Sequence, residues 1–376
     1  MKSVVVIVIS IVVVVIGAIV GLTLLFGRGD KSGSGTKSSV PLNIGRKSGN
    51  DGGVFISEDA GVTWRQLARL SERSTLGGVD VNEIAFDPQN TATTYLTTTV
   101  NGLFMSATGT ADWVRIQDAK GVLTPDATVY QIAFDGNDSK NVYLAVAQGE
   151  IGKVLRSVDG GVSFKEVYQT PKAKSGVFTI VVDPDDSRRI YIGTGEGGLL
   201  TSENRGDSWS VVKWFDNPVR RIYVHPQDAN FMYFTFLGKD IAKVYRSHDH
   251  ARTFEELRVA PPQGKRITVV YDIAFHPTDA NVLYLATSAG VFKTPDAGAT
   301  WQEFPLIIPP ALLPTYTIAV DPRNINILYV SAANQLYKSV DGGASWEVHK
   351  LQTSKNIRIL TFSPASSSIL YAGMRK

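Results

Sequence analysis

The stretch Ser57-Glu58-Asp59-Ala60-Gly61-Val62-Thr63-Trp64 decides the fold, because variants of it return along most of the chain. The shared pattern is Ser-x-Asp-x-Gly-x-Thr/Ser-aromatic, and successive copies begin 45 to 51 residues apart. The other six copies are Ser106–Trp113 in a degenerate form, Ser157–Phe164, Ser202–Trp209, Ser247–Phe254, Thr294–Trp301 and Ser339–Trp346. Self-similarity with such a period is typical of solenoids, propellers and arrays.

A second pattern recurs between these copies: an apolar strand that ends in Asp-Pro or His-Pro, then a polar turn and a strand rich in Tyr, Leu and Val. The clearest examples end at Asp87-Pro88, Asp183-Pro184, His225-Pro226, His276-Pro277 and Asp321-Pro322. Proline presets φ for a tight turn, and an aspartate side chain can hold the turn backbone. Each repeat therefore predicts four short strands, as in a β-propeller blade.

The order of the two patterns predicts how the ring closes. The first folded segment, near Gly53–Trp64, has the Ser-Asp pattern without a preceding Pro turn. The last segment, 357–374, is a Pro-turn hairpin without a following Ser-Asp pattern. Six complete repeats lie between them, so two N-terminal outer strands should join two C-terminal inner strands as a seventh blade. This closure removes open sheet edges. Residues 51–376 are thus predicted to form an all-β, seven-bladed propeller of four-stranded blades.

The N-terminus predicts a membrane anchor. Residues 4–26 carry no charge and are dominated by Val and Ile, which is long enough to span a bilayer with some tilt. We expect residues 1–27 to form an uncleaved transmembrane helix, and the Gly/Ser/Lys-rich residues 28–50 to form a flexible linker. The short N-terminal tail favours an extracytoplasmic propeller, although the charges on either side of the span mildly favour the cytoplasm.

Charge and composition exclude several functions. Of the net charge of +3, residues 1–47 contribute six Lys or Arg and one Asp, so the propeller itself carries about −2. We therefore expect no nucleic-acid partner. The chain has no cysteine, and its five histidines are scattered, so neither a metal nor another cofactor is predicted. We expect the propeller to be monomeric.

The Ser-x-Asp-x-Gly-x-Thr-Trp pattern resembles the Asp box, or bacterial neuraminidase repeat. With its Ile-x-Phe-Asp-Pro lead-in, residues 51–376 resemble the group of photosystem II stability/assembly factor-like proteins and, more distantly, sortilin-type and xyloglucanase-type propellers. A sialidase would bring an Arg-Ile-Pro motif, which is absent here. Xyloglucanase-type enzymes have two propellers in tandem, and sortilin-type receptors have ten blades and a cysteine-rich module. The assembly-factor-like group therefore fits best.

The resemblance implies that each Asp box is a β-hairpin turn at the outer edge of a blade. Its carboxylate would accept backbone N–H bonds, its glycine would adopt a left-handed conformation and its aromatic ring would pack into the blades. Aspartates spread evenly around a ring cannot converge on one substrate, so we interpret the box residues as structural. They are Asp59, Asp159, Asn204, Asp249, Asp296, Asp341, Trp64, Trp113, Trp209, Trp301 and Trp346.

Candidate functional residues should lie on the opposite face, in the turns between second and third strands and in the links between blades. Glu150, Glu196 and Asp240 hold equivalent positions in three successive blades, and paired carboxylates are what glycoside hydrolysis requires. Solvated loop residues are the plainer interpretation. Arg220, Arg221, Lys265 and Arg266 form a basic group that could bind a carboxylate or an acidic peptide. With Glu196 and Asp240 they make up the predicted binding residues.

These observations favour a membrane-anchored, extracytoplasmic scaffold that binds a protein segment or a glycan on this face without catalysis. The first alternative is a glycan-active hydrolase that uses two of Glu150, Glu196 and Asp240. The second is a structural module of the cell envelope or of adhesion.

Overall fold

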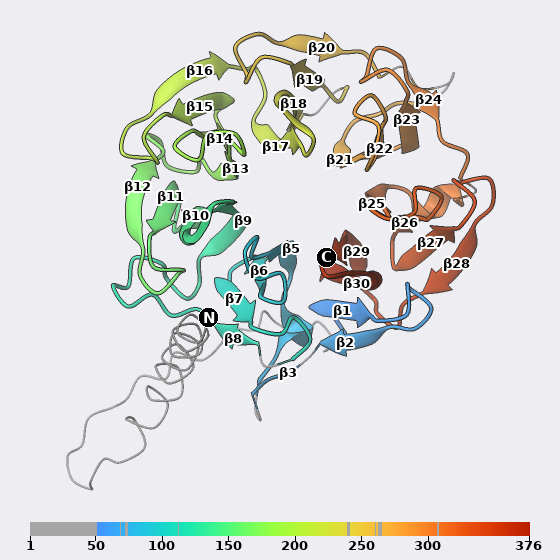
Figure 1. Ribbon diagram of the computed structural model, residues 1–376, viewed down its shortest axis with the longest axis horizontal. Helices are drawn as coiled ribbons and strands as arrows, with labels where there is room; N and C mark the ends of the chain where they lie inside the picture. Colours follow the sequence, from blue (N-terminus) through green and yellow to red (C-terminus); the bar gives the residue numbers. More distant parts are fainter. Residues whose placement is uncertain are drawn as a thin grey trace, which may run out of the picture. The chain divides into compact units, whose positions relative to one another are not determined.

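Seven four-stranded antiparallel sheets follow one another around a ring in the computed structural model of the chain (Figure 1). The structure describes residues 51–376 apart from 68, 72, 73, 112, 239, 240, 260, 262–264 and 307. The predicted seven-bladed, four-stranded propeller is confirmed. The predicted anchor at 4–26 and linker at 28–50 lie outside the described residues. Among the described residues, no helix is long and apolar enough to cross a membrane.

The blades are numbered in chain order, and their strands are given from the channel outward. Blade I is β5 (Val81–Phe86), β6 (Thr94–Thr98), β7 (Leu103–Ser106) and β8 (Val114–Arg115). Blade II is β9 (Thr128–Asp135), β10 (Asp138–Gln148), β11 (Ile151–Ser157) and β12 (Lys165–Gln169). Blade III is β13 (Val177–Val182), β14 (Ile190–Thr194), β15 (Gly198–Ser202) and β16 (Ser210–Trp214).

The remaining blades repeat the same order. Blade IV is β17 (Val219–His225), β18 (Asp228–Phe236), β19 (Val244–Ser247) and β20 (Glu255–Leu257). Blade V is β21 (Val270–Phe275), β22 (Leu283–Thr287), β23 (Gly290–Thr294) and β24 (Gln302–Glu303). Blade VI is β25 (Thr315–Val320), β26 (Leu328–Ala332), β27 (Gln335–Ser339) and β28 (Glu347–Lys350), and blade VII is β29 (Asn356–Ser363), β30 (Ser366–Arg375), β1 (Val54–Ser57) and β2 (Arg65–Leu67). Short elements in the links are β3 (Arg69–Ser71), β4 (Ser74–Thr75), and the 3-10 turns η1 (Leu76–Gly78) and η2 (Pro310–Leu312).

The Asp-Pro and His-Pro pairs form the turn between the first two strands of a blade. Asp87 Oδ1 accepts the N–H groups of Gln89 at 2.8 Å and Asn90 at 3.2 Å. Where histidine replaces aspartate, the ring nitrogen does the same, since His276 Nδ1 accepts the N–H of Asp279 at 3.1 Å. Both side chains are therefore acceptors that satisfy turn amides.

Blade VII closes the ring as predicted. Strand β1 pairs with β30, with Val54 opposite Gly373 and Ser57 opposite Leu370. Met374 N also donates to Gly53 O at 2.8 Å. The N-terminal strands thus supply the outer half of a blade whose inner half is C-terminal, and the ends of the folded chain are hydrogen-bonded to each other (Figure 1).

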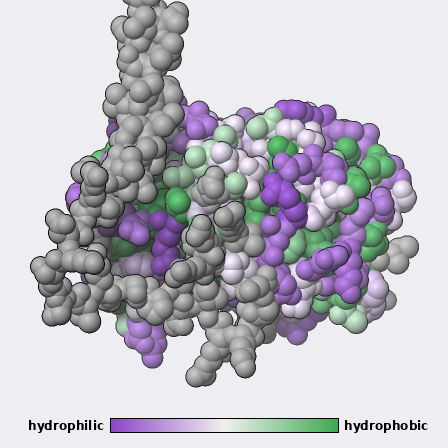
Figure 2. Space-filling view, turned by 90° about the horizontal axis from the view of Figure 1, so that it is seen from below, coloured by the Kyte–Doolittle hydropathy of each residue, from purple (hydrophilic) through white to green (hydrophobic). Residues whose placement is uncertain are grey.

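The buried apolar side chains of the described chain form seven clusters, and each cluster lies between two neighbouring blades. Blades V and VI, for example, share a cluster that contains Tyr284, Phe304 and Tyr337. Along the side of the ring drawn in Figure 2, hydrophilic residues alternate with smaller hydrophobic areas. The core is therefore a set of blade–blade interfaces, and each blade depends on its neighbours for stability.

One turn carries backbone strain that can be relieved. Val100, between β6 and β7, has φ +56° and is 53% exposed, and a β-branched residue is disfavoured there. We expect Val100→Asn to raise the free energy of unfolding by about 1 kcal/mol, because asparagine tolerates the left-handed region better. Urea denaturation measures the change. The equally exposed strand residue Val348 is the control. Val348→Asn should be neutral or destabilising, and an equal gain there would refute the strain argument.

Candidate functional site

The Pro turns and the Asp boxes share one face of the ring. Backbone bonds join them within a blade, as from Arg205 N to Arg188 O (2.9 Å) and from Gly342 N to Asn326 O (2.9 Å). The turns between second and third strands bond instead to the links between blades, as from Gly195 N to Gly176 O (2.8 Å). We call the side formed by these turns and links the loop face.

Each Asp box closes on itself. In the first, Ser57 Oγ accepts the N–H of Gly61 at 2.8 Å, and Asp59 Oδ1 accepts the N–H of Thr63 at 2.8 Å. The hydroxyl of Thr63 donates to the other carboxylate oxygen of Asp59 at 2.5 Å. These bonds, led by those from Thr63, lower the pKa of Asp59 to about 2. The N–H contact recurs around Asp159, Asn204, Asp249, Asp296 and Asp341. The hydroxyl contact recurs at the four aspartates, whereas Asn204 Nδ2 donates to Ser208 Oγ at 2.8 Å. Their oxygens are occupied by the turn itself.

The box tryptophans lie between blades. Trp209 Nε1 donates to Val167 O of blade II at 3.0 Å, and Trp346 Nε1 donates to Pro305 O at 3.0 Å. Trp64 Nε1 donates to Gly61 O at 3.1 Å, while Trp113 is 1% exposed. Trp301 packs in the cluster between blades IV and V. All five fill structural positions at the rim.

The inner strands carry the candidate site. In all seven blades the pairing between the first and second strands skips one residue near the start of the first strand. Such β-bulges redirect a side chain and are frequent beside functional sites. The skipped residues, which we call the bulge ring, are Asn82, Tyr130, Phe178, Arg220, Tyr271, Tyr316 and Arg358.

The bulge ring lines a cavity of about 760 Å³. It lies on the channel near the loop face, because Leu237 and Val269, next to loop-face backbone bonds, also line it. Its other lining residues are Val81, Glu83, Ile84, Arg221, Asp272, Thr317, Ile359, Leu360, Thr361, Arg375 and Lys376. This volume is within the range of small-molecule and peptide side-chain sites. We call this cavity and the bulge ring the channel mouth.

Aromatic rings hold the arginines of the channel mouth. The Arg358 guanidinium lies 3.8 Å from the ring centroid of Tyr316, and Tyr316 meets Tyr271 edge-on at 5.2 Å. Arg220 lies 5.3 Å from the Tyr271 centroid. Across the ring, Tyr130 and Phe178 form another edge-on pair at 5.1 Å. Stacking against aromatic faces fixes the guanidinium planes. Arg220 Nη1 also donates to the main-chain oxygens of Val270 and Tyr271, which holds Arg220 further in place.

A second layer of side chains lies one residue further along each inner strand and closes the cavity below. There a side chain of one blade accepts an inner-strand N–H of the next blade. The contacts are Ile132 N to Glu83 Oε2 (2.9 Å), Ile180 N to Gln131 Oε1 (3.0 Å) and Ile222 N to Thr179 Oγ1 (3.1 Å). Arg221 of blade IV then reaches across the channel to Glu83 of blade I, at 2.7 Å. We call this series of contacts the relay. It links blades I, II, III and IV in order, and the Arg221–Glu83 ion pair joins blade IV to blade I across the channel.

The channel mouth carries an excess of positive charge. Its lining holds four arginines and Lys376 against two carboxylates, Glu83 and Asp272. Burial raises the pKa of both carboxyl groups, and Arg221 opposes the rise. Arg221 is paired with Glu83, whereas Arg358 donates to the main-chain oxygen of Lys376 at 3.2 Å. The site is thus suited to an anionic group.

The structure separates the predicted basic group. Arg220 and Arg221 both line the channel mouth, Arg220 in the bulge ring and Arg221 in the layer below. Lys265 instead forms an ion pair with Glu303 of the outermost strand β24. Arg266 is exposed and does not line the cavity.

The predicted carboxylates do not line the channel mouth either. Glu150 is exposed in the turn after β10, 3.9 Å from Lys174 Nζ. Glu196 is half-buried in the turn after β14, near Tyr168. Asp240 lies outside the described residues. Nothing in the described contacts joins Glu150 to Glu196, so the pairing required for hydrolysis stays a prediction.

Among the lining residues only Arg220 and Arg221 were sequence candidates, so six members of the bulge ring were missed, namely Asn82, Tyr130, Phe178, Tyr271, Tyr316 and Arg358. A signal for them was present. The inner strands place buried apolar residues three apart, as in Val177 and Ile180, where a regular strand alternates every second residue. That spacing indicates a bulge, and the residue after the first apolar position is the one redirected.

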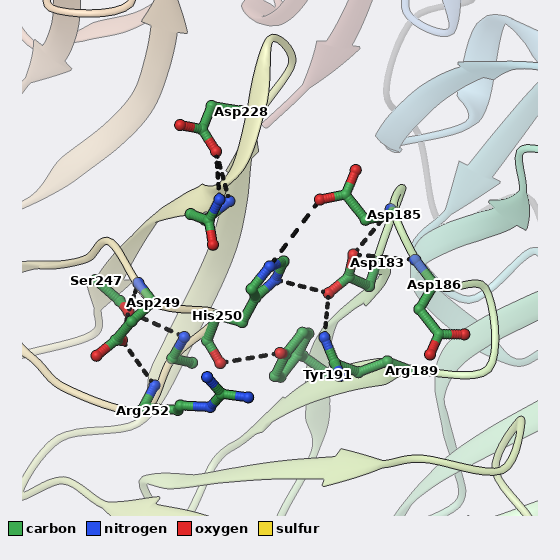
Figure 3. Close-up of polar contacts among 12 residues, drawn as sticks. Asp183, Asp185, Asp186, Arg189, Tyr191, Asp228, Ser247, Asp249, His250 and Arg252 are labelled. Atoms are coloured by element: carbon green, nitrogen blue, oxygen red, sulfur yellow. Dashed lines mark hydrogen bonds and ion pairs between the residues drawn. The ribbon is translucent and has the colours of Figure 1, made fainter.

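The junction of blades III and IV shows how polar contacts on the other face serve packing (Figure 3). His250, from the Asp box of blade IV, points toward the Pro turn of blade III, with Nδ1 3.0 Å from Asp183 Oδ2. Arg189 lies 3.2 Å from the same oxygen, and Tyr191 donates to His250 O at 3.0 Å. In the part of the chain that the structure describes, no group of three or more His, Asp or Glu is arranged to hold a metal ion.

Comparison with known proteins supports the fold. The family model "Sortilin, neurotensin receptor 3" matches residues 242–368, about a third of the chain. No curated protein sequence matches the chain significantly.

Solved structures are similar over most of the chain. The GH74 xyloglucanase of Xanthomonas campestris has a TM-score of 0.65 and 21% identity, over 83% of this chain and 52% of the other. The chain therefore spans about half the length of that enzyme. YCF48 of Cyanidioschyzon merolae has a TM-score of 0.62 and 14% identity, over 83% and 99%. YCF48 bound to D1 peptide has a TM-score of 0.60 and 17% identity, over 79% and 94%. At these identities the likeness establishes the fold, which hydrolases and a peptide-binding protein share.

Proposed function

We propose that the protein is a binding or assembly scaffold that holds a protein segment at the channel mouth and performs no chemistry on it. The observation that carries the proposal is the bulge ring, in which seven successive blades turn one side chain each toward a single cavity. Its combination of four aromatic rings and two arginines suits an extended peptide with an acidic group. Similarity to YCF48, one of whose structures is bound to D1 peptide, supports a peptide ligand.

The hydrolase alternative has less support at the channel mouth. Glu83 accepts bonds from Ile132 N and Arg221, and Asp272 accepts a bond from Thr317 Oγ1 at 2.7 Å. Both carboxylates are thus committed to holding the blades together, whereas a hydrolase needs an acid and a base free to act on a substrate. Release of reducing ends from xyloglucan by the purified chain would favour this alternative over the scaffold.

Peptide binding tests the proposal directly. The full chain, purified in detergent, is titrated with short fluorescent peptides of graded net charge. We expect acidic peptides to bind best. Arg358→Ala should raise their Kd about 10- to 30-fold, because stacked interface arginines are typical hot spots worth about 2 kcal/mol. The control is Arg188→Ala, which removes an exposed arginine from the opposite face. Equal binding by both variants, with folding intact, would contradict the assignment.

We also propose that residues 4–26 anchor the scaffold and that the propeller is extracytoplasmic. The support is the uncharged, apolar length of that segment. Protease added to intact cells should remove the propeller, and cleavage only after lysis would reverse the orientation.

A further inference from the structure

Trp214 stands apart from its equivalents in other blades. It ends β16, the outermost strand of blade III, and is 55% exposed. The next residue, Phe215, donates its N–H to Gly197 O, in the turn before β15, at 2.8 Å. The equivalent position is held by Gln169 in blade II and by Lys350 in blade VI, because each is followed by a residue whose N–H makes the corresponding bond, Thr170 to Gly152 O and Leu351 to Asn334 O. Polar side chains suit this solvated edge, so an exposed tryptophan there requires an explanation.

The indole of Trp214 lies against the sheet as a platform. It pairs with Gly198, and a Cβ at Gly198 would lie 2.9 Å from Trp214 Cζ3. The glycine therefore makes room for the ring to lie across the neighbouring strand. The indole is thus close to the neighbouring strand at Cζ3, while more than half of the residue is exposed to solvent. A flat, immobilised aromatic face costs little conformational entropy when a ligand binds it.

A cavity of about 220 Å³ adjoins this platform, and it has unused polar groups. It is lined by Lys213, Trp214, Phe215, Asp216, Asn217, Phe236, Lys243 and Tyr245. The rings of Phe215, Phe236 and Tyr245 pack against one another. The side chains of Asp216 and Asn217, however, make no hydrogen bond to other described residues. A carboxylate and an amide side by side can together accept from and donate to neighbouring hydroxyl groups.

The charges around this cavity balance. Lys243 Nζ lies 3.8 Å from Glu256 Oε2. The Lys213 ammonium lies over the rings of Phe215 and Phe254, at 5.5 and 5.3 Å from their centroids. Lys213 is thus the one cation left to offset Asp216 among these groups. No net field favours a free anion or cation, which distinguishes the cavity from the channel mouth.

We propose that this cavity is a second binding site, separate from the channel mouth, for a neutral sugar residue of a glycan. The apolar face of a pyranose ring would lie on the negative face of the Trp214 indole, and its C–H groups would point into the ring. Its vicinal hydroxyls would bond to Asp216 and Asn217. The cavity is less than a third of the volume of the channel mouth, so it suits one sugar residue and not a long segment.

Affinity gel electrophoresis of the full chain tests this site with galactomannan, mixed-linkage β-glucan, dextran and, as a charged probe, polygalacturonate. We expect at least one neutral polysaccharide to retard the protein, Trp214→Ala to weaken that retardation tenfold or more, and Trp214→Phe to restore part of it. Val211→Ala, at another exposed position on β16, is the matched control and should bind normally. Arg358→Ala should also bind normally, so this test and the peptide test can fail independently.

Three outcomes would overturn the site. They are no retardation by any neutral polysaccharide, retardation by polygalacturonate alone, and retardation that Trp214→Ala leaves unchanged. Because Trp214 is exposed, its replacement should leave the thermal unfolding midpoint nearly unchanged, and that measurement shows whether the variant is folded.

Discussion

Replacing Gly343 by alanine is expected to lower the free energy of unfolding by about 2–5 kcal/mol, the sum of backbone strain and overpacking. Gly343 has φ +93°, and a Cβ there would lie 2.3 Å from Cζ of Phe304. Phe304 cannot retreat easily, since it is 7% exposed and meets Tyr284 and Trp346 edge-on at 5.5 and 5.9 Å. Thermal and urea denaturation of the variant measure the loss.

The neighbouring glycine provides the control. Gly342 has φ +72°, but the nearest atom to an added Cβ is Asn326 Oδ1 at 3.5 Å. Gly342→Ala therefore adds backbone strain alone and should cost about 1–2 kcal/mol. If the two variants lost equal stability, the contact between blades V and VI through Phe304 would not be the cause.

This contrast explains why the Asp box recurs. At the box glycines Gly206 and Gly298, an outer-strand side chain of the preceding blade comes close, namely Val167 against Gly206 and Leu257 against Gly298. The box is therefore a point of contact between one blade and the blade before it. A fixed spacing of boxes means a fixed spacing of interfaces, which is why sequence alone predicted seven blades and their closure.

The candidate site was less predictable for the same reason. The boxes repeat because every blade needs the same contact, whereas the bulge ring varies from Asn82 to Phe178 to Arg358 because its members face a shared cavity. Arg220 and Arg221 could be selected as an adjacent basic pair. Lys265 looked equivalent in sequence, but its link runs along the outside of blade V, where it meets Glu303. Position in a link does not reveal distance from the channel.

Contacts across the channel could not be predicted at all, since 138 residues separate Glu83 from Arg221. No local pattern links two inner strands that belong to blades I and IV. The pair forms only once the ring is complete, and both partners look like ordinary strand residues until then.

We expect Glu83→Gln to lower the free energy of unfolding by about 2–4 kcal/mol, because it leaves the Arg221 charge without its partner in a mostly buried layer. Arg221 is 34% exposed and Asp272 stays close, so the loss should be smaller than for a fully buried pair. Glu58→Gln is the control, since Glu58 pairs with Arg65 at 3.1 Å with both side chains about half exposed. That change should cost less than about 1 kcal/mol.

A double-mutant cycle with Arg221→Gln separates the ion pair from the rest of the relay. If the contact across the channel holds blade I against blade IV, the two substitutions should be coupled by about 1–3 kcal/mol. Additive effects would mean that Glu83 stabilises the ring mainly through its bond to Ile132 N. The same variants bear on function, because Arg221 and Glu83 form the floor of the channel mouth. Loss of the pair should therefore weaken peptide binding as well, whereas Glu58→Gln should not.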